Sequence, residues 1–200
     1  ICGKWLSFLD SDDEWLPNKL EIQTKHLMGH PECFFLHSEE QWIRNGVRVN
    51  PKQKHQKSGD DMFVRSLEFC IISPSTVVMS KKLFDQYNGF DEKFVVCEDF
   101  DLWNKILARE RVDFISTPVT KKYGGHDDQL STKFVAMDYW RIKSLVNLYH
   151  SHIVNDEQKI EIKNVLIKKS ALLLKNYLKY NNLIHFEEIK TLLHTILPEV

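Results

Sequence analysis

The sequence has no long hydrophobic run and no excess of charge of one sign. None of its apolar runs reaches the roughly 20 residues that a membrane-spanning helix needs, and no signal-peptide pattern opens the chain. The formal net charge is -1 at pH 7, so there is no overall basic field that would attract nucleic acid. The composition therefore gives no support for a membrane-spanning protein or for a nucleic-acid-binding protein.

Cysteine is scarce and shows no paired spacing. The four cysteines lie far apart in the sequence, at Cys2, Cys33, Cys70 and Cys97. Such scattered cysteines indicate free thiols in a reducing compartment. His26, His30 and His37 lie near Cys33 in the sequence, but their spacing matches no familiar zinc pattern. Cys33 and His37 are expected on one face of a predicted strand, whereas His26 belongs to a different element. We therefore expect surface histidines on a helix and a core cysteine here, and no zinc site.

A glycine-rich phosphate-binding loop and internal repeats are also absent from the sequence. The 200 residues, of which 42% are hydrophobic, suffice for one domain or one and a half, with a sizeable core. The chain has no initiator methionine and begins on the approach to a predicted strand. We therefore interpret it as a fragment whose N-terminal part is absent.

Carboxylates are concentrated in one short stretch near the start of the chain. The apolar run 5–9 is strand-like in composition, and Asp10, Asp12 and Asp13 follow it directly. They are therefore expected where a strand ends, which is where open α/β sheets bind ligands. Such close carboxylates repel one another unless a cation lies among them, and Mg²⁺ and Mn²⁺ prefer oxygen ligands. The alternative is a solvated acidic turn before a helix.

The patterns that follow predict a mixture of strands and helices up to residue 131. Strands are expected at 33–37, 76–79, 112–116 and 119–123, and helices at 17–29, 62–69, 81–87 and 98–109. Asn45-Gly46 predicts a hairpin between 41–44 and 47–49, because a type I′ turn needs a positive φ at both central residues. Ser80 is placed as the N-cap of the helix that follows it.

A basic run, 51–57, separates the hairpin from the next predicted helix. Such a charge run most often forms a solvated loop, and we expect a mobile loop here. The functional alternative is that Lys52, Lys54 and Lys57 contact phosphate groups of a substrate.

An acidic pair, Glu98-Asp99, opens the predicted helix 98–109. Acidic side chains in a first turn are favoured by the helix dipole, so the pair has a purely structural interpretation. The functional interpretation is that one of the two carboxylates is a general base, which takes a proton from a reacting hydroxyl group.

Three stretches, in this order along the chain, carry a family resemblance. They are residues 8–17 (FLDSDDEWLP), residues 73–92 and Glu98-Asp99. Together they resemble the metal-binding Asp-x-Asp segment, the acceptor-side segment and the catalytic Glu-Asp motif of glycosyltransferase family 2. The resemblance covers residues 1–131. It implies an α/β fold, with a partial GT-A (Rossmann-like) mixed sheet and flanking helices in 1–131 and an all-helical extension in 132–200.

The resemblance also implies roles for particular residues. Asp99 would be the catalytic base, and Glu98 would orient the acceptor. Asp12 would bind Mn²⁺ or Mg²⁺, and His126 would complete the set of metal ligands. Asp10 would contact the nucleotide ribose or a metal-bound water, and Asp13 would be a second ligand or a support. The family pattern does not apportion these tasks further among the three aspartates.

The implied activity is metal-dependent, inverting transfer of a sugar from a nucleotide-sugar donor to a saccharide or lipid-linked acceptor, for synthesis of a cell-surface polysaccharide. We expect a bacterial, cytoplasmic protein at the inner face of the membrane. In the family, strands before the Asp-x-Asp segment supply much of the nucleotide pocket, and they are absent here. We therefore expect this chain alone to bind the donor poorly or to be inactive.

Two hypotheses compete with sugar transfer. The first is a non-catalytic metal-binding or scaffold module, in which the acidic turn holds a structural ion and a helical tail docks a partner. The second is a metal-dependent nucleotidyl or phosphoryl transferase, which fits less well because no glycine-rich phosphate loop is present.

The character of the sequence changes from about residue 134. Helices are expected at 134–149, 157–180 and 186–197, and the second of them mixes leucine and isoleucine with lysine. The preferred interpretation is a helical extension that closes the domain. A basic amphipathic helix also suits peripheral contact with an anionic membrane.

Overall fold

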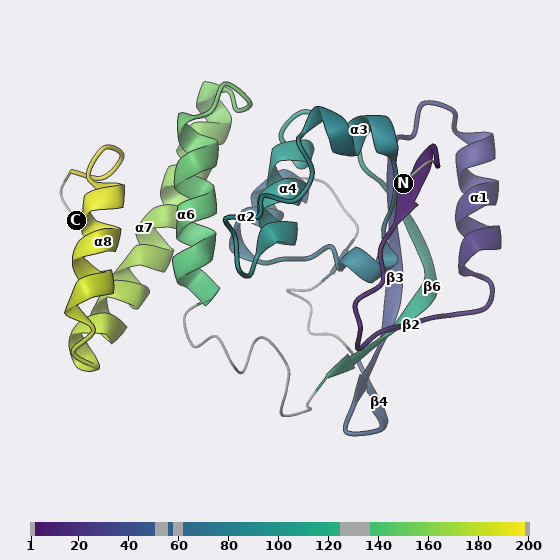
Figure 1. Cartoon of the computed structure of the whole chain (residues 1–200), viewed down its shortest axis with the longest axis horizontal. Helices are drawn as coiled ribbons and strands as arrows, with labels where there is room; N and C mark the ends of the chain where they lie inside the picture. The colour runs from purple at the N-terminus through teal and green to yellow at the C-terminus, as the bar shows by residue number, and fades with distance from the viewer. Residues whose placement is uncertain (1–2, 51–55, 58–61, 125–136, 199–200) are drawn as a thin grey trace.

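The computed structural model describes residues 3–50, 56–57, 62–124 and 137–198 (Figure 1). The strands are β1 (Trp5–Ser7), β2 (Glu14–Trp15), β3 (Phe35–Arg44), β4 (Val47–Val49), β5 (Val78–Ser80) and β6 (Asp113–Gly124). The helices are α1 (Lys19–Gly29), α2 (Met62–Glu68), α3 (Lys81–Gln86), α4 (Glu98–Leu107), α6 (Met137–His150), α7 (Asp156–Lys179) and α8 (Leu183–Leu193), with a 3₁₀ helix, η2, at Pro74–Thr76.

The described strands form one mixed sheet in the order β1-β5-β3-β6-β2, with β4 paired to β3. Strands β3 and β6 run parallel, and the other pairs run antiparallel. Figure 1 shows α1 on one side of this sheet and α3 and α4 on the other. The predicted fold class, a mixed sheet with flanking helices followed by a helical extension, is therefore confirmed.

Local sequence signals are confirmed where they specify turns and caps. Asn45 and Gly46 have φ values of 50° and 76°, as a type I′ hairpin turn between β3 and β4 requires. The Ser80 hydroxyl accepts a hydrogen bond from the Leu83 amide at 3.1 Å, so Ser80 is the N-cap of α3.

The strands differ more from their predictions than the helices do. The segments expected at 33–37 and 41–44 belong to one long strand, β3, and those expected at 112–116 and 119–123 belong to β6. β-Bulges between these two strands and Pro118 within β6 obscure the continuity in the sequence. The two-residue strand β2 was not predicted, because it exists only through its pairing with β6.

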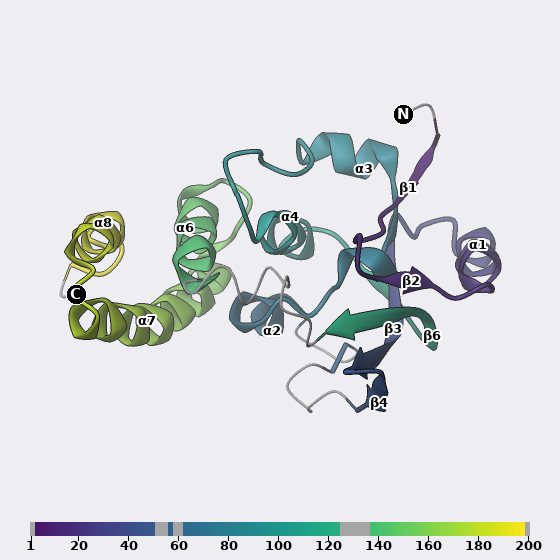
Figure 2. The same cartoon turned by 60° about the horizontal axis from the view of Figure 1, so that its bottom comes forward.

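Two large apolar clusters and a small third one, formed by Cys33, Leu36 and Val78, hold the described residues together. One packs the sheet against α3 and α4, with Phe35, Met79 and Trp103 at its centre. The other joins α2 and α4 to α6, α7 and α8 through a continuous set of side chains that includes Ile142 and Ile162. Figure 2 shows α6, α7 and α8 beyond α2 and α4, on the side away from the sheet. The helical extension is therefore packed directly on the helices that flank the sheet.

The expected boundary between 131 and 132 lies outside the described residues, within the gap 125–136. Among the helices that the structure describes, none combines the length and the hydropathy that crossing a membrane requires.

Candidate active site

The acidic loop between β1 and β2 is held in place by η2. A turn is closed by the Asp13 amide, which donates to the Asp10 carbonyl at 3.1 Å. The Asp10 amide donates to the Ser75 hydroxyl at 3.0 Å, and the Trp15 indole donates to the Ser75 carbonyl at 3.1 Å. Because Ser75 is fully buried, this loop has a fixed position relative to the sheet.

Asp13 has one carboxylate oxygen with a partner and one without. Its Oδ1 accepts a hydrogen bond from the Tyr123 amide at 3.3 Å, at the end of β6. Its Oδ2 is buried and has no hydrogen-bond partner among the described residues. A buried carboxylate oxygen that stays unpaired is costly, so this atom is suited to a bound cation or a donor group of a ligand.

The second acidic group lies at the N-terminus of α4. Cys97, directly before the helix, has a φ of 65°, which is uncommon for a residue with a side chain, and it turns the chain so that Glu98 and Asp99 begin the helix. Asp99 Oδ1 accepts from the Phe100 amide at 2.7 Å, and its Oδ2 accepts from the Cys70 thiol at 3.2 Å.

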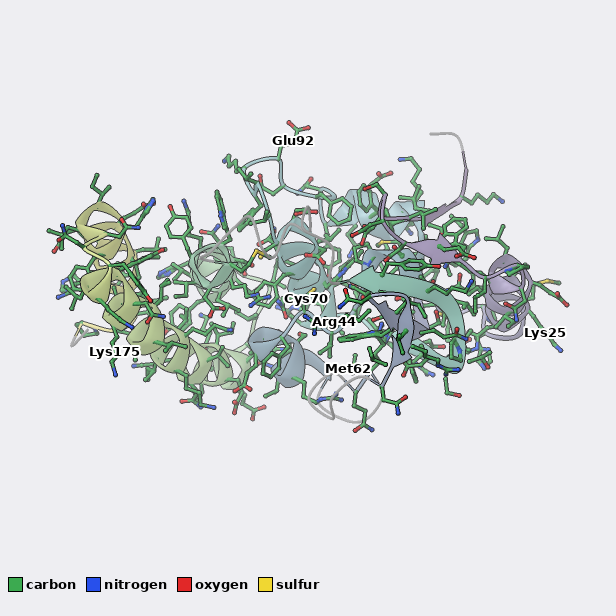
Figure 3. The ribbon with its side chains drawn as sticks, turned by 90° about the horizontal axis from the view of Figure 1, so that it is seen from below. Lys25, Arg44, Met62, Cys70, Glu92 and Lys175 are labelled. Carbon is green, nitrogen blue, oxygen red and sulfur yellow. The ribbon has the colours of Figure 1, made fainter. Side chains whose placement is uncertain are left out.

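Cys70 therefore orients the carboxylate that the family resemblance predicts to be the base. Figure 3 shows Cys70 in the central part of the molecule, whereas Lys25 and Lys175 lie on outer helices at its two ends. Burial raises the pKa of the Cys70 thiol well above its usual value, and the negative charge of Asp99 raises it further. The thiol thus stays protonated and acts as a hydrogen-bond donor.

The β1–β2 loop and the N-terminus of α4 belong to one electrostatic region. Burial raises the pKa of Asp10 to about 6, and the charges of Asp13, Asp99 and Asp12 raise it as well. Burial, with the neighbouring charge of Asp99, also raises the pKa of Glu98. We call these five residues the carboxylate cluster. Such crowded acidic groups favour protonation unless cations are present among them.

A buried polar network lies beside the carboxylate cluster, centred on Glu40 of β3. Glu40 Oε1 accepts hydrogen bonds from the Trp42 indole at 2.7 Å and from the Ser73 hydroxyl at 3.2 Å, and Oε2 is 2.9 Å from the Lys57 ammonium. We call these four residues the Glu40 network. The expectation that Lys57 lies in a solvated loop is wrong: only 3% of Lys57 is exposed, because its charge pairs with Glu40. Lys52 and Lys54 lie outside the described residues.

Lys122 of β6 links the carboxylate cluster to the Glu40 network. Its ammonium donates to the Ser73 hydroxyl at 2.8 Å, and its charge lowers the pKa of both Asp10 and Asp13. Sequence reasoning missed Lys122, Glu40 and Cys70, since the local pattern around each of them indicates only a strand or a connection.

Comparison with known proteins supplies the context for this geometry. A glucosyltransferase of Escherichia coli, WfgD, is 32% identical over 114 residues, 57% of this chain and 42% of WfgD. An uncharacterized glycosyltransferase of Rickettsia bellii is 33% identical over 119 residues, 60% of this chain and 17% of that protein. The chain is homologous to glycosyltransferases. No known protein-family profile matches it.

The fold agrees with this homology. The crystal structure of residues 1–349 of S. aureus TarS, in complex with UDP-GlcNAc, superposes with a TM-score of 0.58 at 16% identity, over 88% of this chain and 49% of TarS. The predicted GT-A type of glycosyltransferase fold is thereby confirmed. The chain spans about two fifths of WfgD and about half of the TarS chain, so it corresponds to part of each of these glycosyltransferases.

The carboxylates of this glycosyltransferase homologue fit a hard divalent cation. Asp13 offers the unpartnered buried oxygen, and Asp12 beside it is exposed. Mg²⁺ commonly takes only one or two protein carboxylates and completes its shell with water and substrate phosphates. Asp12 with Asp13 could supply such ligands. His126, the other predicted metal ligand, lies outside the described residues.

A different group of ligand-type atoms converges between α1 and β6. Within the described part of the chain, His26, Cys33 and Asp113 are the trio whose ligand atoms lie within 4.8 Å of one another. Each is already satisfied by the protein: His26 and Arg111 bind Asp113 at 2.9 Å each, and the Cys33 thiol donates to a backbone carbonyl. The cluster connects α1 to the sheet, and the expectation that Cys33 belongs to the core is confirmed.

Proposed function

We propose that this chain carries the metal-binding and acceptor-activating residues of a glycosyltransferase that uses a nucleotide-sugar donor. The observation that carries the proposal is the carboxylate cluster, in which the loop after β1 and the first turn of α4 are close enough for Asp99 to raise the pKa of Asp10. A scaffold module would not need these two carboxylate groups in one region. Homology to glycosyltransferases supports the same function.

The donor and acceptor classes are proposed from the relatives. WfgD and WfaP of Escherichia coli are named as UDP-Glc:alpha-D-GlcNAc-diphosphoundecaprenol beta-1,3-glucosyltransferases, and TarS was crystallised with UDP-GlcNAc. We therefore favour a UDP-sugar as donor and a saccharide on a lipid diphosphate as acceptor. The product would be a lengthened lipid-linked saccharide.

The proposed reaction is a single displacement. The acceptor hydroxyl oxygen forms a bond to the anomeric carbon, the bond from that carbon to the donor diphosphate breaks, and the hydroxyl proton passes to Asp99. Attack opposite the leaving group inverts the configuration at the anomeric carbon. The hydrogen bonds from Cys70 and from the Phe100 amide hold the Asp99 carboxylate in place before the proton moves.

The remaining carboxylates serve the donor in this proposal. Asp12 and Asp13 would hold Mn²⁺ or Mg²⁺, with Asp10 next to them at the ribose or at a metal-bound water. The bound ion would neutralise the diphosphate leaving group. Glu98, at the start of α4, would orient the acceptor.

Contact with a membrane surface is proposed for α7, since the proposed acceptor is a lipid. The helix exposes Ile160, Ile167, Leu172 and Leu178 and carries several lysines along its length. In a vesicle flotation assay we expect binding to vesicles that contain anionic lipid and little binding to neutral ones. Ile160 and Ile167 are seven residues apart and lie on the same side of the helix, so replacing both by serine should reduce that binding. Equal flotation of this variant and wild type would contradict the assignment.

The test of the proposed function is isothermal titration of UDP, GDP and dTDP, each with Mn²⁺, into this chain. We expect one nucleotide, UDP, to bind weakly but in a metal-dependent way, and Asp12→Ala and Asp13→Ala to remove that binding. Asp85→Ala is the matched control, because Asp85 lies on α3 in an exposed pair with Lys81. If no nucleotide binds to wild type, the proposal fails for this chain and a scaffold function is favoured.

A further inference from the structure

The described part of the active site holds more negative charge than its neighbours neutralise. The carboxylate cluster supplies up to five negative charges, and a donor or acceptor diphosphate would add more. Anionic substrates bind such a region only where cations face them. Among the buried or partly buried cations that the structure describes in this region are Lys57, Lys122 and Arg141. Arg141, over the Phe100 ring, is already paired with Asp138 of its own helix at 3.2 Å.

Lys57 already forms an ion pair within the protein. Its ammonium is 2.9 Å from Glu40 Oε2, and both residues are almost fully buried. The other oxygen of Glu40 accepts from Trp42 and Ser73, so the Glu40 network is nearly balanced without a substrate. Removing Lys57 would leave an unpaired buried carboxylate, so its role is structural.

Lys122 has more N–H donors than hydrogen-bond partners among the described residues. An ammonium group has three N–H donors, and among the described residues only the Ser73 hydroxyl, at 2.8 Å, accepts one of them. No carboxylate of the described residues lies within the 4.0 Å of an ion pair, although the charges of Glu40, Asp13 and Asp99 all act on Lys122. The residue keeps some exposed surface, but protein surrounds its ammonium: burial lowers the pKa of Lys122, and the charges of Glu40 and Asp13 more than offset this, so the ammonium stays charged. A charged ammonium with unfilled hydrogen-bond donors is suited to an anionic group of a ligand.

The position of Lys122 is fixed by the fold. Residues alternate sides along β6, so Lys121 and Lys122 point to opposite faces. Lys121 lies at the surface with 32% of its side chain exposed, and it pairs with Glu14 of β2 at 3.0 Å. Lys122 faces η2 and the Glu40 network, whose Ser73 holds the ammonium in place. The two neighbouring lysines therefore differ in surroundings and share the same strand.

We propose that Lys122 binds a diphosphate oxygen of the substrate at the carboxylate cluster. This inference rests on the proposed function. The charge of Lys122 is felt by Asp13, in the loop that is proposed to face the donor, and by Asp99, which is proposed to face the acceptor. The diphosphate of a nucleotide donor and that of a lipid-linked acceptor have the same chemistry. The geometry favours the donor because Tyr123, the residue after Lys122, donates its backbone amide to Asp13 at 3.3 Å, which places the acidic loop beside this end of β6.

The experiment compares Lys122→Met, Lys122→Arg and Lys121→Met with wild type. Each protein is titrated with UDP plus Mn²⁺ as the donor probe and with geranyl diphosphate as the lipid diphosphate probe. A lost charge-assisted hydrogen bond should weaken UDP binding of Lys122→Met by about tenfold to a hundredfold. Lys122→Arg should retain most of the affinity, and Lys121→Met should match wild type. Thermal unfolding confirms that each variant is folded, and Lys122→Gln replaces Lys122→Met if that variant is not.

The outcomes separate the two proposals. Loss of geranyl diphosphate binding alone would assign Lys122 to the acceptor and overturn the donor assignment. Unchanged affinity of Lys122→Met for both probes, with wild type binding UDP, would overturn the role of Lys122 and leave the proposed function intact. If wild type binds neither probe, the proposed function fails, and the role of Lys122 fails with it.

Discussion

The region around the sheet and the region formed by α6, α7 and α8 bury different kinds of side chain. Around the sheet, Glu40, Lys57 and Lys19 are charged groups with at most 4% exposure. Among the described residues of α6, α7 and α8, the buried polar side chains are Ser144 and Ser170, and the rest of the interior is apolar. Burying charges costs free energy even when they are paired, whereas apolar burial stabilises.

The difference indicates what each region contributes. The sheet region keeps a costly arrangement of charges where the proposed chemistry occurs, and the helices supply apolar stability that offsets it. The two are joined by one apolar cluster, which includes Phe100 of α4 together with Ile162 of α7. Substitutions in the first region should therefore change activity, and substitutions in the second should change the free energy of unfolding.

The largest expected effect is a loss of reaction rate, and it should occur at Asp99 but not at Asp101, although both lie in the first turn of α4. Asp99→Asn should lower the rate of sugar transfer by about 10²- to 10⁴-fold, the usual contribution of a general base. Asp101, two residues later, is buried and pairs with Lys105 and with the Ser144 hydroxyl of α6. Asp101→Asn should instead cost stability, about 1–3 kcal/mol. The measurements are the initial rate with a UDP-sugar and the midpoint of urea unfolding. A full rate for Asp99→Asn would remove Asp99 from the mechanism.

A second comparison lies within α7. Ile162 is fully buried between α7 and its neighbours, and Ile167 is 46% exposed on the same helix. Ile162→Ala should lower the free energy of unfolding by about 2–5 kcal/mol, and Ile167→Ala should change it by less than about 0.5 kcal/mol. Nucleotide affinity, measured at a temperature well below that of unfolding, should stay at the wild-type value in both variants. Weaker nucleotide binding by folded Ile162→Ala would show that the helices do more than stabilise.

Local patterns predicted the helices and most of their ends, because caps and apolar periodicity are set by residues a few positions apart. The exception is α8, which was expected at 186–197 and spans Leu183–Leu193. The acidic loop and Glu98-Asp99 were also found from the sequence, since their residue types stand out. Lys122 and Glu40 could not be found in this way. Lys122 and Glu40 lie close together because β3 and β6 pair in parallel. These strands are far apart in the sequence, and bulges interrupt their pairing. Cys70 contacts Asp99 only because α2 and α4 pack together.

A third prediction uses His37, a buried histidine of β3 in the sheet region. Burial lowers the pKa of His37 to about 3, and the charge of Lys57 contributes. The unfolded chain, with a histidine pKa near about 6.5, binds this proton first as the pH falls, so the folded state loses stability below that pH. The loss should approach about 1.4 kcal/mol per pH unit between pH 6 and 5.

Urea unfolding of wild type and His37→Gln between pH 7 and 5 measures this effect. The stability of wild type should fall more steeply than that of His37→Gln over this range. His152→Gln, at an exposed position, is the control and should follow wild type. Parallel curves for wild type and His37→Gln would contradict a neutral, buried His37.

The smallest expected effect concerns the start of α7. The Asn155 side chain accepts from the Gln158 amide at 2.8 Å, and the Gln158 side chain accepts from the Asn155 amide at 3.0 Å. Loss of this capping box in Asn155→Ala should cost about 1 kcal/mol, or about 2–4 °C in the melting temperature. Asn155→Ser should retain most of the stability. An unchanged melting temperature for Asn155→Ala would mean that tertiary packing alone fixes this helix end.

The bulges between β3 and β6 have a consequence for sequence length. The register passes from Ser38 opposite Ile115 to Glu40 opposite Thr120, and the extra residues include Ser116 and Thr117, which are exposed. Such exposed positions ordinarily tolerate an added residue. Here, one inserted residue that shifted the rest of β6 would exchange the faces of Lys121 and Lys122. Insertions of two residues would preserve the alternation, so the parity of a length change, more than its size, should decide whether this strand keeps its function.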